Sequence, residues 1–248
     1  EPLRTVWCST RFGFSHFFRC CHRYPPEGTQ MKILNLYAGI GGNRKLWDSS
    51  HEIVAVEHDP EIAEQYSELF PRDEMIIGDA HDYLLHNYQD FDFIWSSPPC
   101  QTHTKMAISG QNRTRRYPDM ELYEEILYLR QFCQSWWIVE NVKPYYGALL
   151  EPKAVGRHLF WSNFELLVDD VPRPKGFIQQ TKVTKQDLHD WLDIHFEKNI
   201  YYKWTDADGV LHKNHCPFQI LRNAVHPKIG LQILETVQLL QKENHVTT

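Results

Sequence analysis

The sequence KILNLYAGIGG, residues 32–42, decides the fold of this chain. Its first half is a short apolar run, which predicts a buried β-strand over residues 32–37. The glycines that follow permit positive φ angles and let a ligand approach the backbone closely. We therefore expect a strand, a tight turn and then a helix through Leu46 and Trp47, as in the first unit of a nucleotide-binding α/β fold.

Further strands and helices alternate along the chain from this point. Apolar runs predict strands over residues 52–57, 75–77, 91–95 and 136–142. Apolar positions at helical spacing predict helices that begin at Pro60, cover residues 118–132, and run through Ile229 to Leu240 near the end of the chain. This rhythm predicts an α/β fold with an open, mainly parallel sheet and helices on both faces.

Two segments depart from the rhythm. Residues 1–30 show no periodicity and precede Met31, so we expect an extension outside the core and a natural start at Met31. Residues 164–216 are rich in Pro, turns and aromatic residues and predict a small second lobe. Its one clear helix, over residues 186–195, has a predicted capping box at Thr184 and Asp187. Residues 31–163 and 217–243 then form the main domain.

Composition limits the possible functions. The chain has 248 residues, of which 42% are hydrophobic and 23% are charged, as in ordinary globular proteins. No apolar stretch approaches the roughly 18 residues of a membrane span, so we expect no membrane association. The six cysteines form no CxxC pair, which argues against a zinc site or any other metal site. The net charge is −6, but residues 57–92 hold eleven acidic residues and one basic residue, so a nucleic-acid partner would contact the mildly basic remainder.

The predicted strand ends carry a set of residues suited to an adenosine-type ligand. Glu57 ends the strand that follows the glycine loop, where nucleotide-binding folds place a carboxylate for ribose hydroxyls. Asp79 ends the next strand and is placed to accept a bond from an adenine amino group. An acidic site suits the cationic S-adenosyl-L-methionine better than NADP. The expected cofactor residues here are Tyr37, Ala38, Gly39, Gly41, Gly42, Glu57, His58, Asp79 and Ala80.

A cysteine and a glutamate follow two neighbouring strands. Cys100 comes after Pro98 and Pro99, which stiffen the loop and present the thiol, although a free cysteine alone is more often a small buried hydrophobe. Glu140 ends the strand over residues 136–142 and should lie beside that loop. A carboxylate does not help a thiol to ionise. We therefore expect Glu140 to protonate a ring nitrogen, with a pKa that burial raises.

Taken in order, these residues resemble the C5-cytosine DNA methyltransferase family. The resemblance runs from about Met31 to Leu240 and includes Pro99-Cys100-Gln101, Glu140-Asn141-Val142 and the segment QILRNAVHP at residues 219–227. It implies the Rossmann-like methyltransferase fold, S-adenosyl-L-methionine as the methyl donor, and Pro99, Asn223 and Val225 as further cofactor residues. It also implies that the Cys100 thiolate adds to C6 of a flipped cytosine, that Glu140 protonates N3, that C5 takes the methyl group, and that Cys100 is then eliminated.

The resemblance also implies which residues contact the nucleic acid. Gln101, Lys105, Arg113, Arg115 and Arg116 form a polar, basic segment expected to close over the DNA backbone, and Arg173 and Lys175 open the lobe that reads the target. Within GRHLFWSN, residues 156–163, either Arg157 or His158 is expected to help hold the cytosine. Asn35, Tyr37 and Arg222 are departures from the family pattern.

Several alternatives stay open. Some relatives in this family methylate tRNA, so an RNA cytosine methyltransferase is the nearest rival to an enzyme of double-stranded DNA. A catalytically silent DNA-binding relative would not need Cys100 and Glu140. A nucleotide-dependent oxidoreductase would not explain the Pro-Pro-Cys-Gln and Glu-Asn-Val motifs. Size alone suggests a monomeric cytoplasmic enzyme of a bacterium or phage, for which a paired restriction endonuclease is not required.

Overall fold

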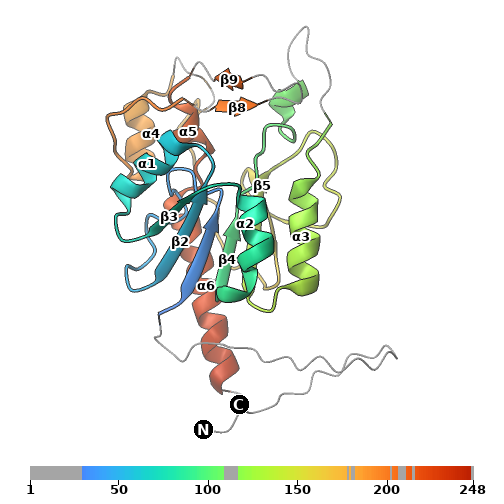
Figure 1. Ribbon diagram of the computed structural model, residues 1–248. Coiled ribbons are helices and arrows are strands. Elements are labelled where there is room, and N and C mark those ends of the chain that lie inside the picture. Colours follow the sequence, from blue (N-terminus) through green and yellow to red (C-terminus); the bar gives the residue numbers. More distant parts are fainter. Residues whose placement is uncertain are drawn as a thin grey trace.

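One seven-stranded sheet forms the centre of the protein (Figure 1). The computed structural model describes residues 30–108, 117–177, 179, 182–201, 203–205, 211–213 and 216–246. The strands of this sheet are β1 (Lys32–Leu36), β2 (Glu52–Glu57), β3 (Glu74–Ile77), β4 (Phe93–Ser96), β5 (Trp136–Val142), β6 (Lys153–Val155) and β7 (His158–Ser162). Their order is β3-β2-β1-β4-β5-β7-β6, in which β7 is antiparallel to β5 and to β6 and the other pairs are parallel. The expected open, mainly parallel α/β sheet is confirmed.

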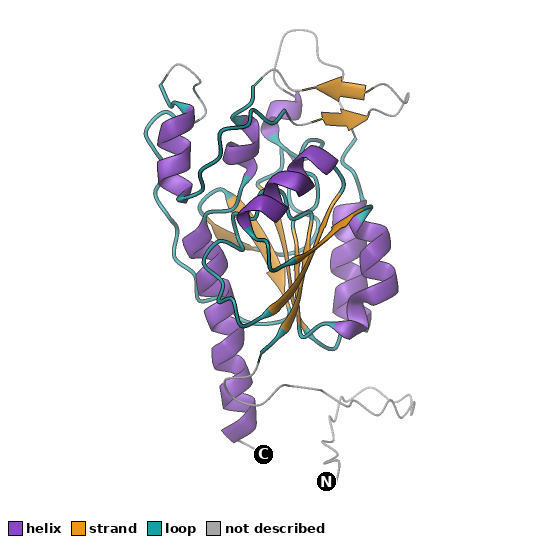
Figure 2. Cartoon of the chain, turned by 60° about the vertical axis from the view of Figure 1, so that its left-hand side comes forward, coloured by secondary structure: helices purple, strands orange, loops and turns teal. Residues whose placement is uncertain are grey.

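Helices cover both faces of the sheet (Figure 2). The helices are α1 (Pro60–Leu69), α2 (Ala80–Asn87), α3 (Glu121–Phe132), α4 (Lys185–Leu192), α5 (Gln219–Asn223) and α6 (Pro227–Val246), with short 3₁₀ turns η1 (Tyr88–Asp90) and η2 (Lys105–Ile108). One apolar cluster joins α2 and α3 to one face of the sheet, and a second joins α6 to the other face. Successive side chains of a strand point to opposite faces of the sheet and so belong to different clusters. Leu34 packs toward α2 and α3, whereas Ile33 packs toward α6.

The five predicted strands are confirmed to within two residues at each end. The predicted capping box is also confirmed, because Thr184 and Asp187 bond each other's backbone N–H groups at the start of α4. That helix is shorter than predicted and ends at Leu192, since Asp193 adopts a left-handed conformation with φ 51°. The helix predicted over residues 118–132 begins only at Glu121.

The helix predicted through Leu46 and Trp47 is wrong, because the segment after the glycine loop consists of turns. Its polar groups are engaged by distant parts of the chain. The Trp47 indole N–H donates to the Gly230 carbonyl at 3.0 Å, and Arg44 Nε donates to Asp73 Oδ2 at 2.7 Å. A Cβ atom on Gly230 would overlap the Asn43 carbonyl oxygen, so α6 packs directly on this segment. Tertiary contacts override the local helical pattern.

The small lobe lies across the carboxyl ends of the parallel strands (Figure 1). It contains α4 and a two-stranded ribbon of β8 (Lys203–Thr205) and β9 (Leu211–Lys213). Leu188 and Leu192 of α4 pack in one apolar cluster with Ile40 of the glycine loop and Ile62 of α1. The lobe therefore shares a core with the main domain at the edge where ligands bind in open α/β sheets. No described helix has the length and apolar composition to cross a membrane.

Candidate active site

A cleft of about 1230 Å³ opens at the carboxyl ends of β1, β2, β4 and β5. Its walls include most of the predicted cofactor residues, namely Tyr37, Ala38, Gly39, Gly42, Glu57, His58, Asp79, Ala80, Pro99, Asn223 and Val225. Cys100, Gln101, Glu140 and Arg157 line the same cleft. Six carboxylate side chains and two cationic side chains, those of Arg157 and Lys203, line the cleft. This excess of negative charge suits a cationic ligand.

Glu57 organises the glycine loop. One carboxylate oxygen accepts the Gly39 backbone N–H at 2.9 Å, and the other accepts the Asp59 N–H at 3.0 Å. Burial raises the pKa of Glu57, while these backbone bonds lower it in part. A carboxylate has about four acceptor positions, so Glu57 retains capacity for a hydroxyl of a bound ligand. Gly39 has a φ of 56°, and a Cβ atom there would meet nothing within 4 Å, so the loop leaves open space beside Glu57.

Two other predicted cofactor residues have visible structural roles. Asp79 caps α2, because its side chain accepts the Asp82 backbone N–H at 3.0 Å. Gly41 lies outside the lining of the cleft, and a Cβ atom there would overlap the Phe70 ring, so this glycine permits close packing against α1.

Glu125 of α3 ties three cleft segments together, and the sequence analysis missed it. This side chain has no exposed surface. It accepts bonds from the Tyr37 hydroxyl at 2.6 Å and the Ser96 hydroxyl at 2.6 Å, and His81 Nδ1 lies 3.2 Å away. These partners follow β1, end β4 and begin α2, respectively. Glu125 therefore holds Tyr37, which has a φ of 53°, a value that non-glycine residues rarely adopt.

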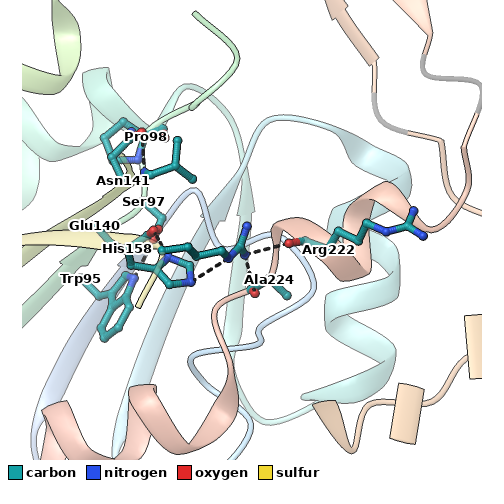
Figure 3. Close-up of polar contacts among 10 residues, drawn as sticks. Trp95, Ser97, Pro98, Glu140, Asn141, His158, Arg222 and Ala224 are labelled. Atoms are coloured by element: carbon teal, nitrogen blue, oxygen red, sulfur yellow. Dashed lines mark hydrogen bonds and ion pairs between the residues drawn. The ribbon is translucent and has the colours of Figure 1, made fainter. Parts of the chain in front are cut away.

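Cys100 follows a proline loop that a neighbouring strand holds in place. The Asn141 side-chain amide donates to the Pro98 carbonyl at 3.0 Å, a role that was not predicted for this residue (Figure 3). Burial raises the pKa of the Cys100 thiol to about 11, with a further contribution from the charge of Glu140, whereas Arg157 opposes the rise. Cys100 is therefore mainly a thiol at neutral pH in the unbound protein.

Glu140 is buried beside this loop, one residue beyond the register partner of Ser96. Burial favours a raised pKa, as predicted from the sequence, but the opposing interactions are together stronger and the pKa is lowered. The opposing contributions are the charge that His158, 2.5 Å away, carries when it is protonated and the hydrogen bond from His158, then the charge of Arg157 and a hydrogen bond from Ser97. The expectation of a protonated Glu140 in the unbound protein is therefore wrong, because its hydrogen-bond donors stabilise the carboxylate.

Arg157 and His158 have different surroundings. Arg157 lines the cleft, and its guanidinium donates to the Arg222 carbonyl at 2.7 Å. His158 is 5% exposed and contacts Glu140 from the adjacent strand (Figure 3). Arg222, a departure from the family pattern, is itself buried and donates to the Phe177 carbonyl of the small lobe at 2.9 Å.

The predicted nucleic-acid residues are scattered. Gln101 lines the cleft, Lys105 is exposed at the start of η2, and Arg173 and Lys175 are exposed in the small lobe. Arg173 lies with its guanidinium 5.6 Å from the Phe177 ring centre. Arg113, Arg115 and Arg116 lie outside the described residues, as does the predicted extension except for Gln30.

The chain is similar to several known proteins. Residues 31–148 match the family described as C-5 cytosine-specific DNA methylase. A tRNA (cytosine(38)-C(5))-methyltransferase of Rattus norvegicus is 29% identical over 119 residues, which cover 46% of this chain and 30% of that protein. The type II methyltransferase M1.HgaI of Avibacterium volantium is 30% identical over 105 residues, covering 36% of this chain and 28% of its own length. A solved structure of Spodoptera frugiperda DNMT2 is 29% identical, with 45% and 35% of the two chains covered and a TM-score of 0.32. The match thus spans about a third of the length of these relatives.

Proposed function

We propose that this protein methylates C5 of a cytosine in double-stranded DNA, since residues 31–148 match the family described as C-5 cytosine-specific DNA methylase. The observation that carries the proposal is that Cys100 and Glu140 line one cleft at the ends of adjacent parallel strands, together with the glycine loop and Glu57. The methyl donor of this family is S-adenosyl-L-methionine, which supplies an electrophilic methyl group when it is bound.

The cleft fits this donor. Glu57 and Asp79 offer carboxylates for hydroxyl and amino groups, and Gly39 leaves open space beside Glu57. The predominance of carboxylates in the lining suits a sulfonium cation. We propose that Tyr37, Gly39, Glu57 and Asp79 hold the donor, and that Val225 closes the far wall.

In the proposed reaction Cys100 is the nucleophile. With a pKa of about 11, roughly one thiol in ten thousand is ionised at pH 7, so activation is a large part of the barrier. Arg157, which favours the thiolate, is the cation that opposes the charge of Glu140. Attack of the Cys100 sulfur on C6 of the pyrimidine forms a C–S bond and moves electron density to C5 and N3. C5 then takes the methyl group, the C5 proton passes to solvent water, and the C–S bond breaks to return Cys100 as a thiolate.

Glu140 stabilises the adduct at N3. It is a carboxylate in the unbound protein, so it must acquire a proton as the base enters. Entry of the base excludes water from a site that is already buried, which raises the pKa of the carboxyl group. A protonated Glu140 donates to N3 and neutralises the charge that the attack of Cys100 generates. The target carbon is stacked inside a duplex, so this chemistry requires the cytosine to be flipped out.

A tRNA substrate is the second candidate, because relatives named as tRNA cytosine-C5 methyltransferases share 29% identity with almost half of this chain. The chemistry of Cys100 and Glu140 is the same for either polymer. The two functions therefore differ in the surface that surrounds the cleft, not in the reacting groups.

The test is bisulfite sequencing of both DNA and tRNA from a host that lacks C5-cytosine methylation. The host expresses the protein, its Cys100→Ser variant, or the matched control Cys133→Ser, whose thiol lies outside the cleft. Protection of DNA cytosines in one short context, dependent on Cys100 but not on Cys133, supports the proposal. Protection of tRNA alone supports the second candidate. Absence of protection in both polymers, with folded protein present, refutes both.

A further inference from the structure

A chain of buried polar groups runs from Glu140 to the C-terminal end of α5. His158 Nδ1 lies 2.5 Å from Glu140 Oε1, and Arg157 Nε lies 3.0 Å from His158 Nε2. Arg157 Nη2 continues to the carbonyls of Arg222 at 2.7 Å and Ala224 at 3.4 Å. Figure 3 shows His158 between Glu140 and these two carbonyls, joined by the dashed lines. Glu140 and His158 are 6% and 5% exposed, so water does not replace these bonds.

The direction of each hydrogen bond follows from the chemistry of arginine. A guanidinium has only N–H donors and no acceptor. Arg157 Nε–H must therefore donate to His158 Nε2, which requires Nε2 to carry no proton. The neutral imidazole then carries its proton on Nδ1 and donates it to Glu140 Oε1. A proton on Nε2 would point at the Arg157 N–H group.

We propose that Arg157 locks His158 as the Nδ1–H tautomer, and that His158 is a positioning residue that keeps Glu140 Oε1 as an acceptor. The assignment of the tautomer stands on these contacts alone. Its consequence for catalysis rests on the proposed function: a proton acquired by Glu140 is confined to Oε2, so the carboxyl group has one orientation of its O–H bond rather than two. His158 thus prepares the geometry of proton donation without touching the substrate.

The contacts of Arg157 hold its guanidinium in place beside His158. The guanidinium donates to two backbone carbonyls, one near the end of α5 and one directly after it, and it lies 5.7 Å from the centre of the Phe177 ring. Arg222 and Ala224 lie at the end of α5, and Phe177 lies in the small lobe. None of these partners belongs to β7, the strand that carries His158. The tautomer of a histidine in the sheet is therefore set by a part of the chain that packs over it.

Nuclear magnetic resonance of ¹⁵N-histidine-labelled protein tests the tautomer without substrate or turnover. Long-range ¹H–¹⁵N spectra distinguish a protonated ring nitrogen from a bare one, and the His158→Asn variant identifies the signals. We expect a protonated Nδ1 and a bare Nε2 in the wild type. Arg157→Ala removes the donor, so we expect loss of the pure Nδ1–H form. The matched control Arg173→Ala removes a second guanidinium that lies over the Phe177 ring, and it should leave the tautomer unchanged. A protonated Nε2 in the wild type, or an unchanged tautomer in Arg157→Ala, overturns the proposal.

A pair of His158 variants tests the consequence for catalysis. His158→Asn places an amide N–H near the position of Nδ1, so it keeps a donor for Glu140, whereas His158→Leu has similar bulk and no donor. We expect kcat for methylation to fall at least about tenfold more in the Leu variant than in the Asn variant, within the range known for positioned acid–base groups. S-adenosyl-L-methionine affinity, measured by calorimetry, should be the same in both. Equal kcat values in the two variants would overturn the positioning role. Absence of methylation by the wild type would instead refute the proposed function and leave the tautomer result intact.

Discussion

Replacement of Glu125 by Gln tests the buried network beneath the cleft. Gln has nearly the same shape, so the change exchanges one acceptor oxygen for an N–H₂ donor and removes the charge. In the wild type, Glu125 accepts hydrogen bonds from the Tyr37 and Ser96 hydroxyls. In the variant, one of these hydroxyls must rotate so that it accepts a bond from the new N–H₂ group. Rearranging one buried hydrogen bond costs about 1 kcal/mol at any pH.

The larger effect comes from His81 and depends on pH. The hydrogen bond to Glu125 raises the pKa of His81 to about 8 from its ordinary value of 6.5. Such a shift corresponds to about 2 kcal/mol of stability. Because the pKa is raised in the folded protein, this stabilisation is fully present below pH 6.5 and is lost as the pH rises through about 8. Glu125→Gln should therefore cost about 3 kcal/mol near pH 6 and about 1 kcal/mol near pH 9.

Urea unfolding of the wild type and the variant at these two pH values measures the difference. Glu124→Gln is the matched control, because the neighbouring Glu124 is exposed and should change stability little at either pH. An equal cost of Glu125→Gln at both pH values would refute the His81–Glu125 pairing. A cost no greater than that of the control would refute the buried network as a whole.

Three further predictions concern Glu57 at the glycine loop, the packing of α6 and the thiol of Cys100. Glu57→Gln should weaken S-adenosyl-L-methionine binding at least about tenfold in calorimetry, since the amide cannot accept both backbone bonds, and unchanged affinity would contradict the role of Glu57. Gly230→Ala should lower the free energy of unfolding in urea by about 1–3 kcal/mol, the usual cost of overpacking. Its Cβ would overlap the Asn43 carbonyl oxygen, whereas a Cβ at Gly78 would meet nothing within 4 Å, so Gly78→Ala is the control that should be tolerated. Alkylation of Cys100 by iodoacetamide in the unbound protein should accelerate with pH up to about 11, and a plateau near pH 8 would contradict the raised pKa.

The sequence predicted the parts of this site that belong to regular strands. Buried parallel strands are continuous apolar runs, so their carboxyl ends can be located from the sequence. Glu57 and Glu140 lie at or near such ends, and Cys100 follows one. The pKa of Glu140 was predicted wrongly because it depends on the contact with His158. That contact follows from the antiparallel pairing of β5 with β7, and the sequence of a single strand does not predict its pairing register.

Glu125 was missed for a related reason. Its partners Tyr37, His81 and Ser96 lie 88, 44 and 29 residues away along the chain, and only the folded sheet assembles them. One signal was present in the sequence. Leu122, Glu125 and Leu129 share a helical face, so a carboxylate stood among residues predicted to be buried. A charged side chain in such a position must be paired or hydrogen-bonded. In this fold its polar partners lie at the strand ends.

The packing of α6 on the turn that follows β1 has a consequence for how the protein is made. Trp47 and Gly230, which form a hydrogen bond, are 183 residues apart, so this contact cannot form until Gly230 has been synthesised and has left the ribosome. Val225, which lines the cleft, is synthesised only five residues before Gly230. A nascent chain can thus hold Cys100 and Glu140 in an assembled sheet while its donor site is still open on one side. Long loop closures of this kind slow folding. The complete cleft should therefore appear only after Gly230 has left the ribosome.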